Sequence, residues 1–249
     1  MALQEELELQ GNYLFKYRGT LPLIILFSGI LTFIYSKINL NGFEKYVSYK
    51  DYELLCLLVS FIGFAIRVYT VGYTPKNTSG RNTESQLADE LNKSGSYSIV
   101  RHPLYAGNFF MWLGVGLLTQ NIWYIISFVF IYWVYYERIM FAEEQFLRKK
   151  FGESYLEWAA VTPAFIFSFK NYTPPKISFS WKKVVKQEKN GFTAIFVVFF
   201  LFRSINDFIE TETIVVNSRL AYITAGSIVL YFILKYVKKY TTILNEKER

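Results

Sequence analysis

The sequence is short of the residues on which several common kinds of site depend. It contains a single cysteine, Cys56, and a single histidine, His102. One cysteine cannot form a disulfide within the chain, and this pair is too small for the usual zinc ligand sets. The phosphate loop Gly-x-x-x-x-Gly-Lys and the dinucleotide fingerprint Gly-x-Gly-x-x-Gly are also missing. We therefore expect no metal site and no nucleotide-binding loop of these types.

Charge is scarce as well, and its placement favours a membrane over nucleic acid. Charged residues make up 19% of the chain, against 52% hydrophobic and 20% aromatic residues, with a net charge of +7. The basic residues flank apolar runs, so anionic lipid headgroups are better partners than nucleic acid. The first residues include Glu5, Glu6 and Glu8 and no basic segment, which argues against a cleavable signal peptide.

The apolar runs predict an all-α, polytopic membrane helix bundle with about six spans. Two arms of about 16 residues, separated by Thr119, Gln120 and Asn121, form a predicted helical hairpin. At 1.5 Å per residue each arm is roughly 24 Å long, which is short for a ~30 Å hydrocarbon core. The run at 192–202 is the weakest, because Arg203 and Asp207 follow it closely. The expected spans are 21–38, 54–73, the two arms within 104–136, 192–202 and 220–237.

The loop charges predict that both termini are cytoplasmic. Most lysines and arginines lie in alternate connections, and an even number of spans places these connections and both termini on one side. Three lysines, Lys37, Lys45 and Lys50, lie in the first loop of the opposite side and argue against this orientation.

The chain divides into three predicted parts. Residues 1–172 form the membrane core, with the motifs at 95–163. Residues 173–190, with Pro174-Pro175 and then Trp181 among lysines, are predicted to be a linker leading into a basic segment that lies on the membrane surface. Residues 191–249 form a final pair of membrane helices.

The first motif runs from Gly95-Ser96-Tyr97 to the segment Arg101-His102-Pro103-Leu104-Tyr105-Ala106-Gly107. Proline is favoured at the first position of a helix, and the N–H groups of the turn that follows carry a partial positive charge. Arg101 and His102 lie at that helix start, and Gly107 leaves room for a ligand or another helix. The simpler interpretation is that Arg101 and His102 anchor a helix end among lipid headgroups.

The second motif is a group of charges after the hairpin. If the second arm continues as a helix, Glu137 and Glu144 share a face, and Glu143 lies about 100° around. A helix emerging into water can carry such residues without a function. However, these carboxylates are on the same predicted side as Arg101 and His102. Carboxylates can hold an ammonium group and ribose hydroxyls, and S-adenosylmethionine offers both.

Together the motifs resemble the isoprenylcysteine carboxyl methyltransferases and the related phospholipid methyltransferases. The shared pattern is Gly-x-Tyr, then Arg-His-Pro-x-Tyr-x-Gly, an apolar hairpin, Glu-Glu and Phe-Gly-x-x-Tyr. The chain has Gly95 to Tyr97, Arg101 to Gly107, Glu143-Glu144 and Phe151 to Tyr155 in that order. The resemblance covers a little over a quarter of the sequence.

The resemblance implies an S-adenosylmethionine-dependent integral membrane methyltransferase acting on a membrane lipid or a lipidated acceptor. In this family the cofactor lies between the Arg-His-Pro segment and the Glu-Glu helix, and a C-terminal cytosolic helix closes the site. Arg101 and Glu144 are the expected catalytic residues. The expected cofactor-binding residues are Tyr97, His102, Tyr105, Gly107, Glu143 and Glu144.

One departure bears on the acceptor. The prenylcysteine enzymes carry an Arg-Val-Pro that meets the substrate carboxylate, whereas this chain has Ala160-Val161-Thr162-Pro163. An anionic oxygen needs no general base, and the basic surface favours such an acceptor, so O-methylation with Arg101 as the charge partner is expected. A lysine between 182 and 189 is an alternative partner. An amine acceptor would first lose a proton, with help from His102 or Glu144.

Two other functions remain open. Sterol reductases share an Arg-His-Pro-x-Tyr-x-Gly but use NADPH, and a non-catalytic membrane protein could keep the same fold. Binding of S-adenosylmethionine, of NADPH or of neither separates the three. Gly114-Val115-Gly116, inside the first hairpin arm, is expected to be a close helix contact rather than part of a cofactor site.

Overall fold

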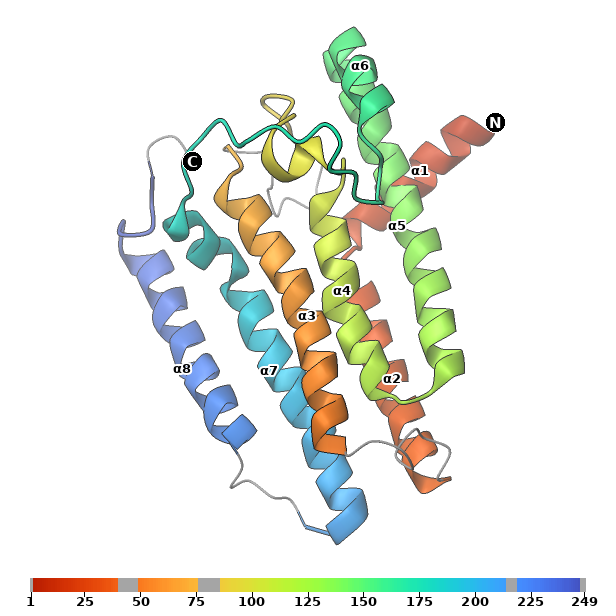
Figure 1. Cartoon of the computed structure of the whole chain (residues 1–249), viewed down its shortest axis with the longest axis vertical. Helices are drawn as coiled ribbons and strands as arrows, with labels where there is room; N and C mark the ends of the chain where they lie inside the picture. Colours follow the sequence, from red (N-terminus) through yellow and green to blue (C-terminus); the bar gives the residue numbers. More distant parts are fainter. Residues whose placement is uncertain (1, 40–48, 76–85, 214–218, 247–249) are drawn as a thin grey trace.

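The computed structural model describes residues 2–39, 49–75, 86–213 and 219–246 (Figure 1). These residues form α-helices and one short 3-10 helix, η2, and contain no strand. The helices are α1 (Leu3–Lys16), α2 (Leu21–Ile38), α3 (Tyr49–Gly72), η2 (Gly95–Ser98), α4 (Pro103–Leu118), α5 (Ile122–Phe151), α6 (Glu153–Val161), α7 (Trp181–Thr211) and α8 (Arg219–Tyr240).

The expected all-α membrane bundle is confirmed. Five of the described helices, α2, α3, α5, α7 and α8, are long and apolar enough to cross a bilayer, and α4 is a shorter apolar helix of 16 residues. These six run along the length of the molecule (Figure 1). Large apolar side chains such as Phe27, Phe130 and Phe232 are exposed on their outer faces. Such surfaces are suited to lipid, because every backbone group of a helix is already hydrogen-bonded.

The bundle has two apolar centres. One joins α1, α2 and α5 around Phe15, Ile25 and Tyr132. The other joins α2, α3, α4 and α7 around Phe33, Cys56, Val115, Phe199 and Phe202. The second centre therefore includes α7, so this C-terminal helix is packed into the core of the molecule.

Small residues bring α3 and α4 into close contact. A Cβ atom at Gly114 would collide with the Ser60 hydroxyl and the Cys56 carbonyl, and one at Gly63 would collide with the Gly107 carbonyl. Side chains larger than hydrogen cannot fit where two helix backbones approach this closely. The close contact expected at Gly114 is thus confirmed.

Helix α7 differs from the expectation for residues 173–202. It begins at Trp181, where the Ser180 hydroxyl accepts from the Lys183 N–H at 3.0 Å, and it continues to Thr211. The boundary expected at residue 190 falls inside this helix, so residues 181–190 form its first turns and not a separate surface segment. Arg203 does not shorten the helix, because its guanidinium is paired with the Glu53 carboxylate of α3. Pairing with an opposite charge removes most of the free-energy cost of placing a charged side chain within the membrane.

Helix α5 is also longer than its predicted arm. It starts at Asn121, whose side-chain oxygen accepts from the Tyr124 N–H at 3.1 Å, and it runs for 30 residues. Gly152, with a φ of 54°, then turns the chain into α6. Glu143 and Glu144 therefore lie on the part of α5 beyond the apolar bundle. The prediction from the second motif depends on such a continuous helix.

Helix α1 was not among the expected elements. It lies along the charged half of α5, where Gln4 donates to Gln145 at 3.2 Å and Lys149 donates to Glu8 at 2.5 Å. Gly11 permits the approach, because a Cβ atom there would collide with the Arg138 carbonyl.

The first motif is held by the chain that follows α6. The Arg101 and His102 N–H groups donate to the carbonyls of Pro163 and Ala164 at 2.9 and 3.2 Å. The Gly95 N–H donates to the Thr173 carbonyl at 2.9 Å. Residues 163–173 therefore run beside residues 95–102 and fix the start of α4.

The described ends of the chain lie at the same end of the bundle as η2 and α6 (Figure 1). Which side of the membrane this end faces stays a prediction. Of the three lysines that argued against the predicted orientation, Lys37 has its ammonium group 3.4 Å from the Glu210 carboxylate. Lys45 lies outside the described residues.

Candidate active site

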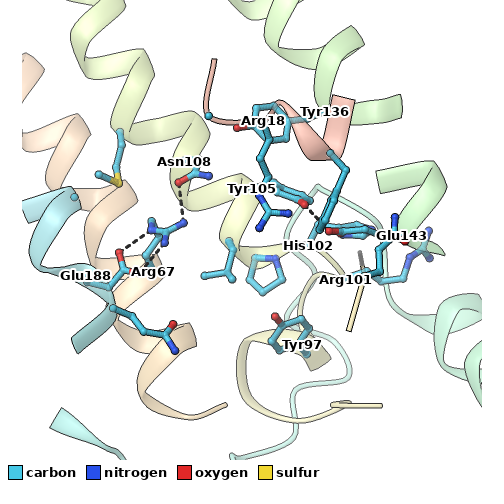
Figure 2. A pocket seen from close by; sticks show the side chains of 18 of the residues that line it. Arg18, Arg67, Tyr97, Arg101, His102, Tyr105, Asn108, Tyr136, Glu143 and Glu188 are labelled. Atoms are coloured by element: carbon cyan, nitrogen blue, oxygen red, sulfur yellow. Dashed lines mark hydrogen bonds and ion pairs between the residues drawn. The ribbon is translucent and has the colours of Figure 1, made fainter. Parts of the chain in front are cut away.

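A cavity of about 800 Å³ lies where α3, α4, α5, α7 and the segment around η2 meet (Figure 2). Its polar side chains include Tyr97, His102, Tyr105 and Glu143, which come from both motifs. Its apolar wall continues along α4 and α7 with Met111, Val115, Ala194, Ile195 and Val198. The cavity is therefore polar where the motifs meet and apolar farther along the bundle.

The two motifs are joined by a network around His102. Its Nε2 lies 2.9 Å from Glu144 Oε1, and its Nδ1 lies 3.5 Å from Glu143 Oε2. The Tyr105 hydroxyl donates to Glu143 Oε1 at 2.5 Å (Figure 2). The adjacent carboxylates thus lie against opposite nitrogens of the same imidazole, and both hold the start of α4 against α5.

Burial lowers the pKa of His102, but the hydrogen bonds and negative charges of Glu143 and Glu144 outweigh burial. The net result is a pKa above the ordinary value of 6.5. A protonated imidazole donates from both nitrogens, which suits two carboxylates on opposite sides of the ring. The contacts with Glu143 and Glu144 therefore favour the protonated form of His102.

Arg101 is engaged with protein groups. Its Nε donates to Glu144 Oε1 at 2.8 Å and its Nη2 to Glu144 Oε2 at 3.3 Å. Its Nη1 donates to the carbonyls of Ala159 and Thr162 at 2.8 and 2.7 Å. The guanidinium therefore ties α5, α6 and the start of α4 together. This geometry supports a structural role for Arg101 more than a role as the charge partner of an acceptor.

Tyr97 is fixed by its backbone as well as by its place beside the cavity. Its carbonyl accepts from the Trp158 indole N–H of α6 at 3.1 Å. Enclosure by the protein raises the pKa of Tyr97, so the phenol stays protonated and can donate a hydrogen bond.

Two expected site residues lie behind the cavity and not on its wall. Glu144 faces Arg101 and His102, as described above, and does not line the cavity. Gly107 faces α3, where a Cβ atom would lie 2.6 Å from Arg67 Cγ and 2.9 Å from the Gly63 carbonyl oxygen. A glycine in a motif can serve a ligand or a neighbouring helix, and here the neighbouring helix lies against it.

A second polar group in the cavity was not predicted. Arg67 of α3 donates from Nε and Nη2 to the two carboxylate oxygens of Glu188 at 2.8 and 2.6 Å, and from Nη1 to Asn108 Oδ1 at 2.8 Å. Figure 2 shows this group across the cavity from Tyr105 and Glu143. An arginine inside an apolar span was the available signal, since such residues usually have a function. Glu188 was hidden among the lysines of the segment interpreted as a linker.

Among the described residues, no group of three or more histidine, cysteine, aspartate or glutamate side chains is arranged to hold a metal ion. The polar end of the cavity instead offers the Glu143 carboxylate, the His102 imidazole and the phenols of Tyr97 and Tyr105. These groups fit a ligand that carries an ammonium group, a carboxylate and hydroxyls. The expected cofactor has all three.

The comparisons with known proteins agree with the motifs. Residues 54–154 match the family model for phospholipid methyltransferases. The protein-S-isoprenylcysteine O-methyltransferase of Saccharomyces cerevisiae is 31% identical over 105 residues, which cover 41% of this chain and 43% of the relative. The protein-S-isoprenylcysteine O-methyltransferase B of Arabidopsis thaliana is 27% identical over 139 residues, covering 54% of this chain and 68% of the relative.

A further relative carries a different kind of name. The cobalt-zinc-cadmium resistance protein CzcN of Cupriavidus metallidurans is 32% identical over 111 residues, or 44% of this chain and 49% of the relative. The chain thus spans less than half the length of the yeast and Cupriavidus relatives. No solved structure matches the chain. In its matched region and in the order of its motifs, the chain is therefore similar to the phospholipid and isoprenylcysteine methyltransferases.

Proposed function

We propose that this protein transfers a methyl group from S-adenosylmethionine to a membrane lipid or a lipidated acceptor. The observation that supports this most directly is the cavity where Tyr97, His102, Tyr105 and Glu143 converge, in a helix bundle whose residues 54–154 match the phospholipid methyltransferase model. The cofactor supplies a methyl group on a sulfonium centre. The protein has to align the acceptor with that group at about 3–3.5 Å and exclude water.

Different residues of the cavity can bind the cofactor and the lipid acceptor. The Glu143 carboxylate faces the cavity and can accept from an ammonium group or a ribose hydroxyl, while the Tyr97 phenol can donate. His102 and Glu144 keep Glu143 and the start of α4 in place. The apolar wall of α4 and α7 provides a surface for a lipid chain.

The proposed acceptor group is an anionic oxygen. Ala160 stands where the prenylcysteine enzymes have their carboxylate-binding arginine, so a different cation has to serve an anionic acceptor here. The substitutes expected from the sequence are poorly suited to this, since none of the lysines between 182 and 189 lines the cavity. Arg101 is bonded to Glu144 and two carbonyls, and Lys183 donates to the carbonyls of Thr74 and Pro75 at 2.7 and 2.8 Å.

Calorimetry on the purified protein in detergent with added lipid tests the cofactor. We expect S-adenosylmethionine and its demethylated product to bind, and NADPH not to bind. A folded protein that binds neither form of the cofactor would overturn the proposal. Binding of NADPH alone would favour the reductase. Glu143→Gln should weaken binding of both forms, because it removes the charged acceptor that faces the cavity.

A further inference from the structure

The Arg67 group lies deeper in the cavity than the motif residues. Asn108 follows His102 by six residues on the same chain segment, which places it about 9 Å farther along α4 at 1.5 Å per residue. Arg67 therefore faces the cavity between its polar end and the apolar wall. An acceptor headgroup has to occupy this region if its lipid chain lies along α4 and α7.

Arg67 still has donors to offer. A guanidinium has five N–H groups, and Glu188 and Asn108 accept from three of them. No described residue accepts from the other two. The Arg67 side chain is 16% exposed and that of Glu188 only 2%, so the arginine is the member of the pair that faces the open space.

Three neighbouring residues hold the Arg67 side chain so that it faces the cavity. The missing side chain of Gly107 makes room for its stem, because a Cβ atom there would lie 2.6 Å from Arg67 Cγ. Asn108 holds one edge of the guanidinium and Glu188 holds another. The motif residue Gly107 and the Glu188 carboxylate of α7 thus act on the same side chain.

The apolar wall continues from this group on the same helix faces. On α4, Met111 and Val115 follow Asn108 at intervals of three and seven residues. On α7, Gly191 and Ile195 follow Glu188 at the same intervals. Residues at these spacings share one face of a helix. The cavity is therefore shaped for an amphiphile with a polar group at Arg67 and an apolar chain beyond it.

The charges of the cavity favour an anionic headgroup. The wall already contains compensating charges: the guanidinium groups of Arg18, Arg67 and Arg101 lie with the carboxylates of Glu90, Glu143 and Glu188, and Glu144 lies behind Arg101. A zwitterionic amino acid with a sulfonium adds one positive charge. An acceptor oxyanion offsets that positive charge, and uncompensated charge is costly where water is excluded.

We infer that Arg67 binds the anionic oxygen of the acceptor amphiphile, and that Glu188 of α7 is the residue that positions Arg67. The inference rests on the proposed function and assigns its acceptor site. It also gives α7 a part in the active site, which the motifs alone do not.

The chain contains a matched control for the experiment. Glu53 of α3 and Arg203 of α7 form a second ion pair between the same two helices, and neither lines the cavity. Arg67→Gln/Glu188→Gln and Glu53→Gln/Arg203→Gln each remove both members of one α3–α7 ion pair. A purely structural role predicts similar behaviour for the two double variants.

The probes are dodecyl phosphate and dodecanol, which share a chain and differ in charge. Calorimetry in a non-ionic detergent, with the protein loaded with demethylated cofactor, measures the preference for the phosphate. We expect the Arg67→Gln/Glu188→Gln variant to lose roughly tenfold to a hundredfold of the wild-type preference, as for one or two charged hydrogen bonds. The Glu53→Gln/Arg203→Gln variant should keep it. Equal preference in the two double variants would overturn the inference.

Glu188→Gln alone gives a readout that a structural role would not produce. Removing the competing carboxylate should tighten binding of dodecyl phosphate, while transfer of radiolabel from the cofactor to native lipid extract slows because Arg67 is no longer held. Weaker phosphate binding in this variant would contradict the inference. Failure of the proposed function would be seen separately, as wild-type protein that does not bind the cofactor.

Discussion

Adjacent carboxylates at the site have different environments. Glu143 lines the cavity and accepts from Tyr105, whereas Glu144 lies behind it and accepts from Arg101 and His102. A sequence motif written Glu-Glu does not distinguish these positions, because two neighbours on a helix point about 100° apart. The contacts of each oxygen therefore decide its role.

Substitution should separate the two roles. Glu144→Ala leaves Arg101 and His102 without their carboxylate, and a buried charge without a partner is costly. We expect a lower melting temperature together with weaker cofactor binding. Glu143→Gln should weaken cofactor binding by roughly tenfold to a hundredfold and change the melting temperature little. Thermal unfolding and calorimetry on the two proteins measure this, and a Glu144→Ala protein with normal stability would contradict the assignment.

His102 provides a test by pH. Because its pKa is raised in the folded protein, its ion pairs contribute stability that is fully present below about pH 6.5. This contribution is lost as the pH rises through the folded pKa. His102 is the only histidine, so selective isotope labelling gives one imidazole to follow by NMR. We expect a titration midpoint above 6.5 and a smaller loss of stability at alkaline pH in His102→Gln. A midpoint at or below 6.5 would show that the carboxylates do not hold the proton.

At the scale of elements, the contact between α3 and α4 depends on particular glycines. Gly114 and Gly116 belong to one tripeptide, yet only Gly114 faces the α3 backbone. A Cβ atom at Gly116 would make ordinary contacts of 3.7 Å or more with Phe128 and Tyr124. Gly114 is therefore a site of close contact with α3, and Gly116 offers a control position on the same helix for substitution experiments.

We expect Gly114→Ala to destabilise the protein by about 1–3 kcal/mol, as overpacking usually does. Gly116→Ala should be neutral or slightly stabilising, since alanine favours a helix more than glycine does. Thermal unfolding in one detergent compares the two variants directly. Equal stability would mean that α3 and α4 are less closely packed than the structure describes.

The sequence predicted elements and site residues to different extents. The spans at 21–38 and 220–237 correspond closely to α2 and α8, because long apolar runs are a strong local signal. Helix α1 and the full length of α7 were missed, because both depend on partners distant in the sequence. The same holds for Arg67 and Glu188, which are 121 residues apart and meet only in the fold. Motif residues could be found from spacing alone, but which of them line the cavity could not.

At the scale of the whole molecule, the proposed acceptor depends on which positively charged side chains lie in the cavity. The arginine that prenylcysteine enzymes use is replaced by Ala160, and the carbonyls of Ala159 and Thr162 beside it are occupied by Arg101. The cation near the apolar wall is Arg67, on the opposite side of the cavity from Glu143. A small prenylcysteine therefore lacks its usual carboxylate partner.

We expect a membrane lipid with an anionic headgroup to be methylated in preference to a farnesylcysteine analogue. Incubation with radiolabelled S-adenosylmethionine, native lipid extract and the analogue, followed by separation of the products, measures the preference. Label should enter the lipid fraction. Efficient labelling of the analogue with none in the lipid extract would contradict the prediction.

The two ion pairs between α3 and α7 also bear on how the chain enters the membrane. Glu53 and Arg67 are 14 residues apart on α3, and Glu188 and Arg203 are 15 apart on α7, in an order that pairs opposite charges only when the helices run antiparallel. If α7 were inserted in the reverse sense, two carboxylates would meet at one end and two guanidinium groups at the other. Unpaired or like charges within a bilayer are costly. The order of the four charges is therefore compatible only with the antiparallel arrangement of α3 and α7.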